Sequence, residues 1–135
     1  MNYLIIGLAG AIGALARYYL GVATGASWHY IFPLATLLAN LSGSFILGWF
    51  TAYLSRLNKL HPHLVTGIGT GLIGSFTTFS TFSVETVQLI QGGNWGTAMA
   101  YVLLSLWGGL LFSWSGFRLG HSQYNKRAAA GGEER

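Results

Sequence analysis

The run Gly71-Leu-Ile-Gly-Ser-Phe-Thr-Thr-Phe-Ser-Thr-Phe-Ser-Val-Glu85 decides the fold, because it places polar side chains inside a long apolar stretch. From Phe76 to Phe82 every side chain carries either a hydroxyl or a phenyl group. Such a run allows the backbone to leave the helical hydrogen-bond ladder, which at membrane depth is tolerated only inside protein or beside a water-filled cavity. We therefore predict a helix broken at its centre within an assembly. Carbonyls freed in this way hold small cations such as Na⁺ in transporters, so a bound cation is expected.

The surrounding sequence is that of an all-α membrane protein. Of the 135 residues 52% are hydrophobic and only 7% are charged, far below the roughly 25% charged content of soluble domains. Apolar stretches of the length that a helix needs to span a bilayer occupy Tyr3 to Thr24, Phe32 to Leu54, Leu64 to Ile90 and Trp95 to Phe117. We expect four transmembrane helices in one membrane domain, residues 1–120, and a polar, disordered tail over residues 121–135.

Small residues inside these stretches predict close helix packing. Gly7, Gly10 and Gly13, with Ala11 and Ala14, give small-xxx-small spacing, as do Ala39 with Gly43 and Gly67 with Gly71. In lipid such residues promote association because they let backbones approach. A wide aqueous pore through one subunit is therefore not expected.

The composition also excludes several classes of function. The chain has no Cys, so thiolate chemistry and Cys-ligated zinc are absent. It contains no nucleophile elbow and no phosphate loop, so an enzyme is not expected. The basic residues are scattered toward helix ends, which is typical of a membrane flank rather than of a nucleic-acid site.

Phe79 and Phe82 are three residues apart and share a helical face. They are either ordinary core residues or ring edges that face an anion, because the edge of a phenyl ring is electropositive. Asn40, Ser80, Thr81 and Ser105 would add the weak donors that a dehydrated anion needs for both binding and release. Asn40 has an alternative role as a helix-to-helix hydrogen bond.

Two charged residues fall within predicted spans. Glu85 is the only acid there, and it is either a functional intramembrane group or a hydrated residue near a helix end. Arg17 either reaches lipid phosphates at the interface or lines a vestibule, where it raises the local anion concentration.

The chain resembles the Fluc (CrcB) fluoride channel family over nearly its whole length. The resemblance rests on Gly10-Ala-Ile-Gly-Ala-Leu-Ala-Arg-Tyr18, Thr36-Leu-Leu-Ala-Asn-Leu-Ser-Gly43 and, above all, Gly74-Ser-Phe-Thr-Thr-Phe-Ser-Thr-Phe-Ser-Val-Glu85. It implies a dual-topology dimer of two antiparallel four-helix subunits in the plasma (inner) membrane, with two narrow pathways that export cytoplasmic fluoride passively.

The resemblance also implies roles for individual residues. The backbone carbonyls of Gly74 and Thr77 would hold a structural Na⁺ at the dimer centre. The fluoride pathway would consist of the following residues: Asn40, Phe79, Ser80, Thr81, Phe82, Glu85, Tyr101 and Ser105, with Arg17 in the vestibule.

Two departures from the family pattern bear on these expectations. A hydroxyl often found one turn beyond the Ser105 position is replaced here by Gly109. In addition, six of the seven basic residues fall on the side of the two termini, with Arg17 alone opposite, a bias that favours one orientation in the membrane. We expect a homodimer, with a heterodimer of oppositely inserted paralogues as the alternative.

A small four-helix multidrug exporter with proton coupling is the alternative function. That class resembles this chain in size and in antiparallel assembly. It uses a membrane-buried Glu in the first helix, however, and none occurs here.

Overall fold

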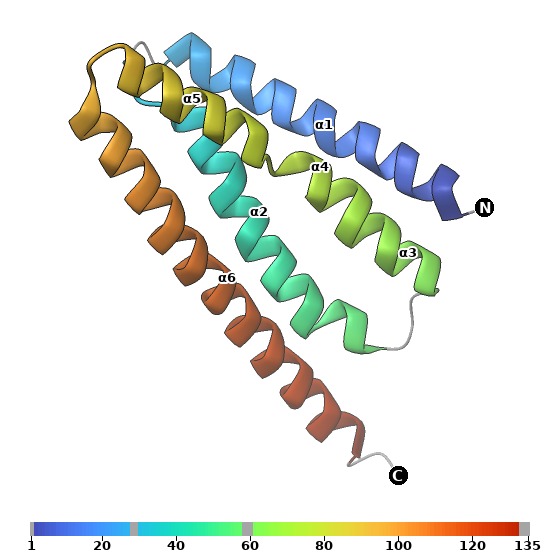
Figure 1. Cartoon of the computed structure of the whole chain (residues 1–135). Helices are drawn as coiled ribbons and strands as arrows, with labels where there is room; N and C mark the ends of the chain where they lie inside the picture. Colours follow the sequence, from blue (N-terminus) through green and yellow to red (C-terminus); the bar gives the residue numbers. More distant parts are fainter. Residues whose placement is uncertain (1, 28–29, 58–60, 133–135) are drawn as a thin grey trace.

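The computed structural model describes residues 2–27, 30–57 and 61–132, and all its regular elements in those ranges are helical (Figure 1). Two of them, η1 and η2, are respectively a 3₁₀ helix and a π-helix. In chain order the elements are α1 (Asn2–Ser27), α2 (Leu34–Ala52), η1 (Leu54–Leu57), α3 (Pro62–Thr66), η2 (Gly67–Ile73), α4 (Gly74–Phe76), α5 (Phe79–Gln91) and α6 (Trp95–Gly132).

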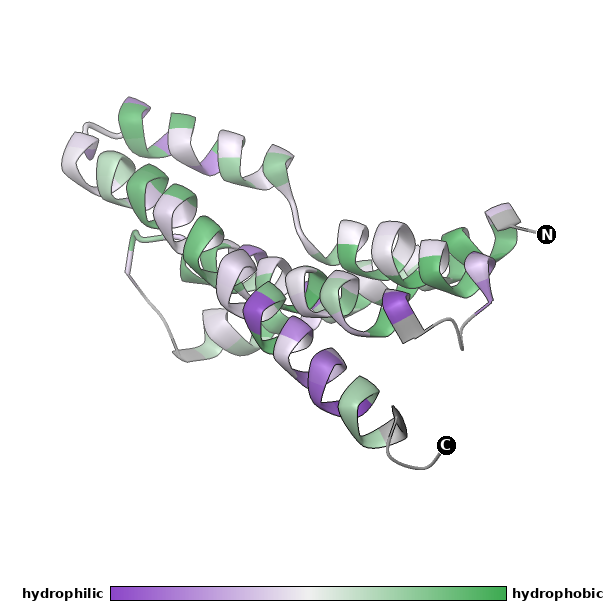
Figure 2. Cartoon of the chain, turned by 90° about the horizontal axis from the view of Figure 1, so that it is seen from below, coloured by the Kyte–Doolittle hydropathy of each residue, from purple (hydrophilic) through white to green (hydrophobic). Residues whose placement is uncertain are grey.

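Three of the described helical stretches are long and apolar enough to cross a membrane, namely Tyr3–Ala26, Leu34–Arg56 and Trp95–Ala130. The 26 residues of α1 correspond to about 39 Å at 1.5 Å per residue, which exceeds the roughly 30 Å hydrocarbon core. Figure 2 shows apolar residues along most of the chain and hydrophilic ones gathered toward the C-terminal end of α6. The molecule is therefore a multi-pass membrane protein.

The helices pack in two seams that the third predicted span connects. α1 packs along η2 and α4, whereas α2 packs along α6 (Figure 1). After α4 the chain changes partner, because α5 packs against α6. The third stretch thus belongs to one seam in its first half and to the other in its second half.

Glycines permit the close approach in both seams. A Cβ atom added at Gly13 in α1 would overlap the carbonyl of Leu72, and one added at Gly116 in α6 would overlap the carbonyl of Phe45 in α2. The seam of α1 was expected from the small-residue spacing. The α2–α6 seam also depends on glycines in α6 that the sequence analysis did not select.

The change of partner occurs at Thr77 and Thr78, where the backbone is extended. Their φ and ψ angles are −79° and 156° for Thr77, and −150° and 123° for Thr78. Thr78 then caps the next helix, since its Oγ1 accepts a hydrogen bond of 3.2 Å from the Thr81 amide, as Thr commonly does at this position. α5 begins directly after it.

The expectation of a disordered tail from residue 121 requires correction. α6 continues as a helix to Gly132, with residues 133–135 outside the described part. Its last turns are held by the end of α2: Trp49 Nε1 donates to Gln123 Oε1 at 2.8 Å, and Arg127 donates to the Tyr53 hydroxyl at 3.2 Å. Lys, Arg and Ala in this stretch also have high helix propensity.

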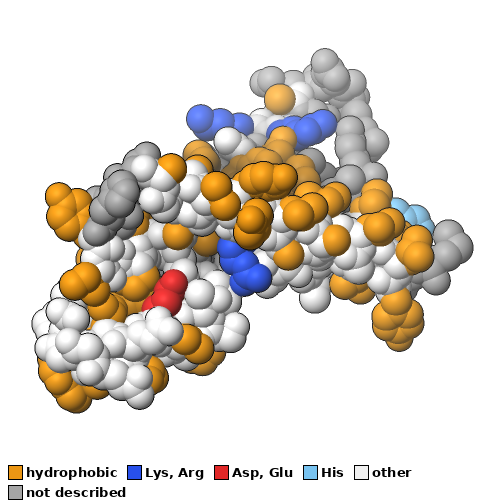
Figure 3. Space-filling model, turned by 90° about the horizontal axis from the view of Figure 1, so that it is seen from above, with side chains coloured by type: hydrophobic (Ala, Val, Ile, Leu, Met, Phe, Trp, Pro, Cys, Tyr) orange, Lys and Arg blue, Asp and Glu red, His pale blue; other side chains and the backbone are white. Residues whose placement is uncertain are grey.

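Few side chains are buried within the subunit itself. The main core cluster combines Leu37, Leu89, Ala98 and Tyr101 at one end of α2, α5 and α6. Hydrophobic side chains cover much of the exposed face in Figure 3. Extended apolar surface of this kind needs lipid or another protein subunit as its surroundings.

Candidate functional site

Two hollows lie between the helices, and several of the predicted site residues line them. The first, of about 480 Å³, opens between α2, the Thr77–Thr78 connection, α5 and α6. No charged side chain is among the residues that line it, which are Asn40, Gly43, Ser44, Leu47, Thr77, Thr78, Phe79, Phe82, Val102, Ser105 and Leu106.

Asn40 connects α2 to the Thr77–Thr78 connection. Its Nδ2 donates to the Thr78 carbonyl at 2.9 Å, and its Oδ1 accepts from the Thr78 amide at 2.8 Å. Because a backbone amide can only donate and a carbonyl can only accept, these two bonds fix the orientation of the Asn40 side chain. In a continuous helix the Thr78 amide would instead reach the carbonyl of Gly74.

Asn40 therefore joins α2 to the extended connection between α4 and α5, and not directly to a residue within another helix. Its second Nδ2 hydrogen is not used by either of these bonds, and the residue also lines the hollow. An amide in this position can hold the connection and still offer one donor to a bound anion.

The hydroxyls of Ser80 and Thr81 converge on Thr78. Thr78 Oγ1 lies 3.0 Å from Thr81 Oγ1 and 3.2 Å from Ser80 Oγ. Thr78 itself is buried, whereas Ser80 and Thr81 are exposed in the single subunit. Thr78 was not selected from sequence, although a Thr directly before a helical stretch is a recognisable capping signal.

Phe79 and Phe82 both border the same hollow, with their ring centroids 5.8 Å apart. Phe82 continues into the core through Tyr101, at 5.1 Å between centroids. Phe79 is 79% exposed, so packing inside this subunit does not account for it. Its ring is open to contacts from outside this chain.

Glu85 is held by two hydroxyls from different helices. Its Oε1 accepts from Thr36 at 2.8 Å, and its Oε2 accepts from the Tyr101 hydroxyl at 2.7 Å. Both donors are buried, with Tyr101 fully so. Thr36 was missed as a site residue, because nothing in its sequence position shows that α2 begins beside α5.

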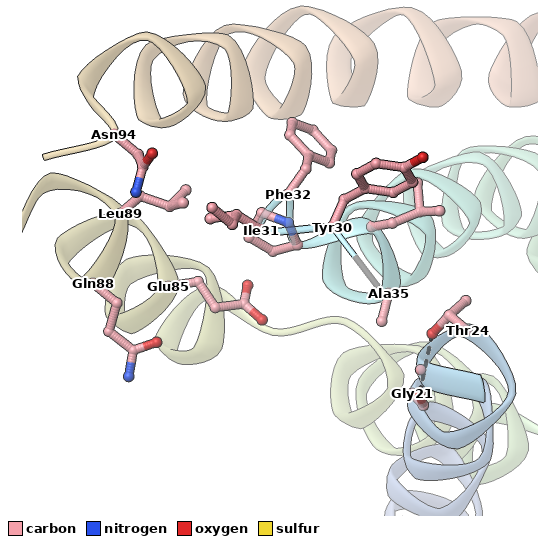
Figure 4. Close-up of a pocket in the computed structure, with 13 residues that line it drawn as sticks. Gly21, Thr24, Tyr30, Ile31, Phe32, Ala35, Glu85, Gln88, Leu89 and Asn94 are labelled. Carbon is pink, nitrogen blue, oxygen red and sulfur yellow. Dashed lines mark hydrogen bonds between the residues drawn. The ribbon is translucent and has the colours of Figure 1, made fainter. Parts of the chain in front are cut away.

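The carboxylate of Glu85 also borders the second hollow, of about 360 Å³. Figure 4 shows Glu85 and Gln88 extending from α5, with Phe32 on the connection to α2 and with Thr24 on α1. Glu85 thus lies between a buried hydroxyl pair and an open space at one end of the subunit.

Two further predicted residues, Ser105 and Arg17, differ in their surroundings. The Ser105 hydroxyl oxygen is buried, yet within the described residues it has no hydrogen-bond partner. Arg17 is partly buried on α1 and lines neither hollow, and no hydrogen bond or ion pair joins it to another residue in the described ranges. Asn40, Phe79, Phe82 and Ser105 thus line the first hollow and Glu85 lines the second. The other predicted pathway residues line neither hollow, namely Ser80, Thr81, Tyr101 and Arg17.

The residues expected to hold Na⁺ lie at the end of α4. Thr77 donates from its amide and its hydroxyl to the Ile73 carbonyl, at 3.0 and 3.1 Å. Gly74 is exposed in the subunit. Since the Thr78 amide donates to Asn40, the Gly74 carbonyl lacks its usual helical donor.

The comparisons with known proteins agree with this picture. A family model described as "CrcB-like protein, Camphor Resistance (CrcB)" matches residues 4–117. The "Fluoride-specific ion channel FluC 1" of Bacillus anthracis is 54% identical over 129 residues, which are 96% of this chain and 94% of that protein.

More distant relatives carry the same description. The "Fluoride-specific ion channel FluC 2" of Geobacillus kaustophilus is 50% identical over 87% of this chain and 91% of its own length. That of Listeria monocytogenes is 42% identical over 93% of this chain and 95% of its own length. With a family match over residues 4–117 and relatives aligned nearly from end to end, the chain belongs to the CrcB family.

Proposed function

We propose that this protein is a fluoride-selective channel that exports cytoplasmic fluoride passively across the plasma membrane. The observation that carries the proposal is the 480 Å³ hollow, which combines two phenyl rings with hydroxyl and amide groups and has no charged lining residue. The names of the relatives, all fluoride-specific ion channels, support the same substrate.

The chemistry of the hollow suits a small anion that has lost its water. Phe79 and Phe82 offer electropositive ring edges, and Asn40 and Ser105 offer neutral donors within the lining. Ser80 and Thr81 would add hydroxyl donors beside Thr78. A site of weak donors binds an ion firmly enough to replace its hydration but releases it again, as conduction requires. Glu85 and Tyr101 extend the polar route toward the second hollow, and Arg17 attracts anions at a vestibule.

The proposed assembly is an antiparallel homodimer in which the third stretch forms a single span broken at its centre. Large apolar side chains on α1 and the ring of Phe79 are exposed in the single subunit, and a second subunit would cover part of that surface. The bias of basic residues toward one side keeps a heterodimer with an oppositely inserted paralogue as the alternative.

A structural Na⁺ belongs to this proposal. The carbonyls of Gly74 and Thr77 from both subunits would hold it. When bound, the cation would coordinate these carbonyl oxygens. Without a partner in hydrocarbon, each of them would cost several kcal/mol. We propose that it is not transported, so fluoride flux needs no Na⁺ gradient.

The multidrug exporter receives no support. The relatives named above are described as fluoride-specific, and α1 contains no carboxylate for proton coupling. The family description mentions camphor resistance. Exchange of a proton for a drug in the exporter class would use a carboxylate in α1, and none of the described residues that line either hollow is such a group.

Purified protein in liposomes provides the test. Fluoride efflux under an electrical gradient, followed with an ion-selective electrode, should be fast, while chloride is retained, because donors spaced for a small dehydrated anion do not satisfy a larger one. Comparable loss of chloride would contradict the proposal. Reversal of the flux by a Na⁺ gradient, at zero voltage and equal fluoride, would show a coupled carrier instead.

A further inference from the structure

The first hollow contains a hydroxyl that neither the motifs nor the comparisons assign. Ser44 lies four residues after Asn40 in α2, so both residues project from the same side of that helix. Both line the hollow, together with Ser105 from α6. The hollow is thus bordered by polar groups from two facing helices.

The surroundings of Ser44 differ from those of a neighbouring serine. The hydroxyl of Ser42 donates to the carbonyls of Leu38 and Ala39 in its own helix. Within the described ranges Ser44 has no hydrogen-bond partner, although the residue is partly buried. A serine in a helix commonly returns its hydroxyl to its own backbone, so a free hydroxyl facing a hollow calls for an explanation.

Ser105 presents the same feature from the opposite side. Its Oγ is buried and without a partner in the described part of the chain. Buried polar atoms are nearly always hydrogen-bonded, and the exceptions commonly indicate an ion or a water molecule. Two unpartnered hydroxyls on facing helices, in one hollow, indicate a common ligand.

Gly109 keeps the space beside Ser44 open. A Cβ atom built at Gly109 meets one atom within 4 Å, the Ser44 Oγ at 4.0 Å. A side chain at position 109 would therefore point at Ser44 without a clash. A hydroxyl carried there by α6 would occupy the neighbourhood that the Ser44 hydroxyl now reaches from α2.

We propose that Ser44 is a further ion-binding residue, which donates its hydroxyl to fluoride where α6 has only Gly109. This inference rests on the proposed function of the chain. The donor suits a small dehydrated anion because it is neutral and because its hydrogen is not engaged elsewhere. Ser44 extends the polar lining by one helical turn beyond Asn40.

The experiment compares fluoride efflux from liposomes for the wild type, S44A, S42A and two double variants, S44A/G109S and S44A/G109A. Loss of a hydrogen bond to an anion should slow S44A by about tenfold or more. S42A is the matched control and should keep the wild-type rate. Size-exclusion chromatography establishes that each variant is folded, which is expected because Ala has high helix propensity.

The double variants separate the hydroxyl from packing. S44A/G109S returns a hydroxyl from the opposite helix and should recover most of the lost rate, while S44A/G109A should not. Equal rates for the two double variants would overturn the proposal, as would a wild-type rate in S44A. If the wild-type protein moves no fluoride, the proposed function itself fails, and this inference fails with it.

Discussion

The two halves of the third stretch contrast with each other. Before Thr77, η2 consists of Gly-Ile-Gly-Thr-Gly-Leu-Ile. It packs on α1 through glycines, which carry no side chain. After Thr78, α5 begins with Phe-Ser-Thr-Phe-Ser, and its two phenyl rings border the hollow between α2 and α6. The first half makes close backbone contact, and the second half carries most of the proposed pathway residues. Substitutions should therefore damage folding in the first half and conduction in the second.

The largest effect is expected at Gly13, which faces the first half. In Gly13→Ala the new Cβ overlaps the Leu72 backbone, which cannot move as a flexible side chain would, so the α1 seam should open and folded protein should be lost. Overpacking usually costs about 1–3 kcal/mol and occasionally more. Gly7→Ala is the control, because nothing lies within 4 Å of its Cβ position. Equal yields of monodisperse protein for both variants would refute the role of this seam.

An intermediate effect is expected at Asn40, which connects the two halves. Asn40→Ala removes the two hydrogen bonds to the Thr78 amide and carbonyl, each with a net contribution of about 0.5–1.5 kcal/mol. The melting temperature in detergent should fall, and α5 should exchange its amide hydrogens faster than α1. Ser42→Ala on the same helix is the control. Unchanged exchange in α5 would show that Asn40 does not hold the connection.

The smallest effect on folding, but a large one on conduction, is expected in the second half. Phe79→Ile keeps apolar bulk and removes the polarised ring edge, as does Phe82→Ile. Because Phe79 is exposed in the single chain, the Phe79→Ile variant should melt at nearly the wild-type temperature. Its fluoride efflux should drop sharply. Val84→Ala, at an exposed position on α5 that lines neither hollow, is the control. Normal efflux in both Phe variants would assign these rings to packing.

Much of this contrast was predictable from the sequence. The spacing of Gly10 and Gly13 indicated a close helix contact, and the structure places both against the third stretch. The apolar stretches predicted both ends of α1 and α2 and the start of α6 to within a few residues, because hydrophobic length reports directly on the membrane span. The pathway and Na⁺ roles of individual residues remain predictions.

Other features depend on contacts between distant parts of the chain. Thr36 is separated from Glu85 by 49 residues, and Trp49 from Gln123 by 74. Hydrophobic periodicity reports on neighbours within one helix and not on contacts across such separations. The hydroxyl pair on Glu85 and the helical continuation of α6 were therefore not predicted. The polar composition after residue 120 favoured disorder, whereas docking against the end of α2 stabilises the helix.

The double hydrogen bond between Asn40 and Thr78 also bears on biosynthesis. Asn40 precedes Thr78 by 38 residues, so during synthesis from the N-terminus α2 leaves the ribosome before the connection does. Without this partner, the amide and carbonyl of Thr78 would be costly in lipid. The order of the chain ensures that the partner is already made when the connection is inserted.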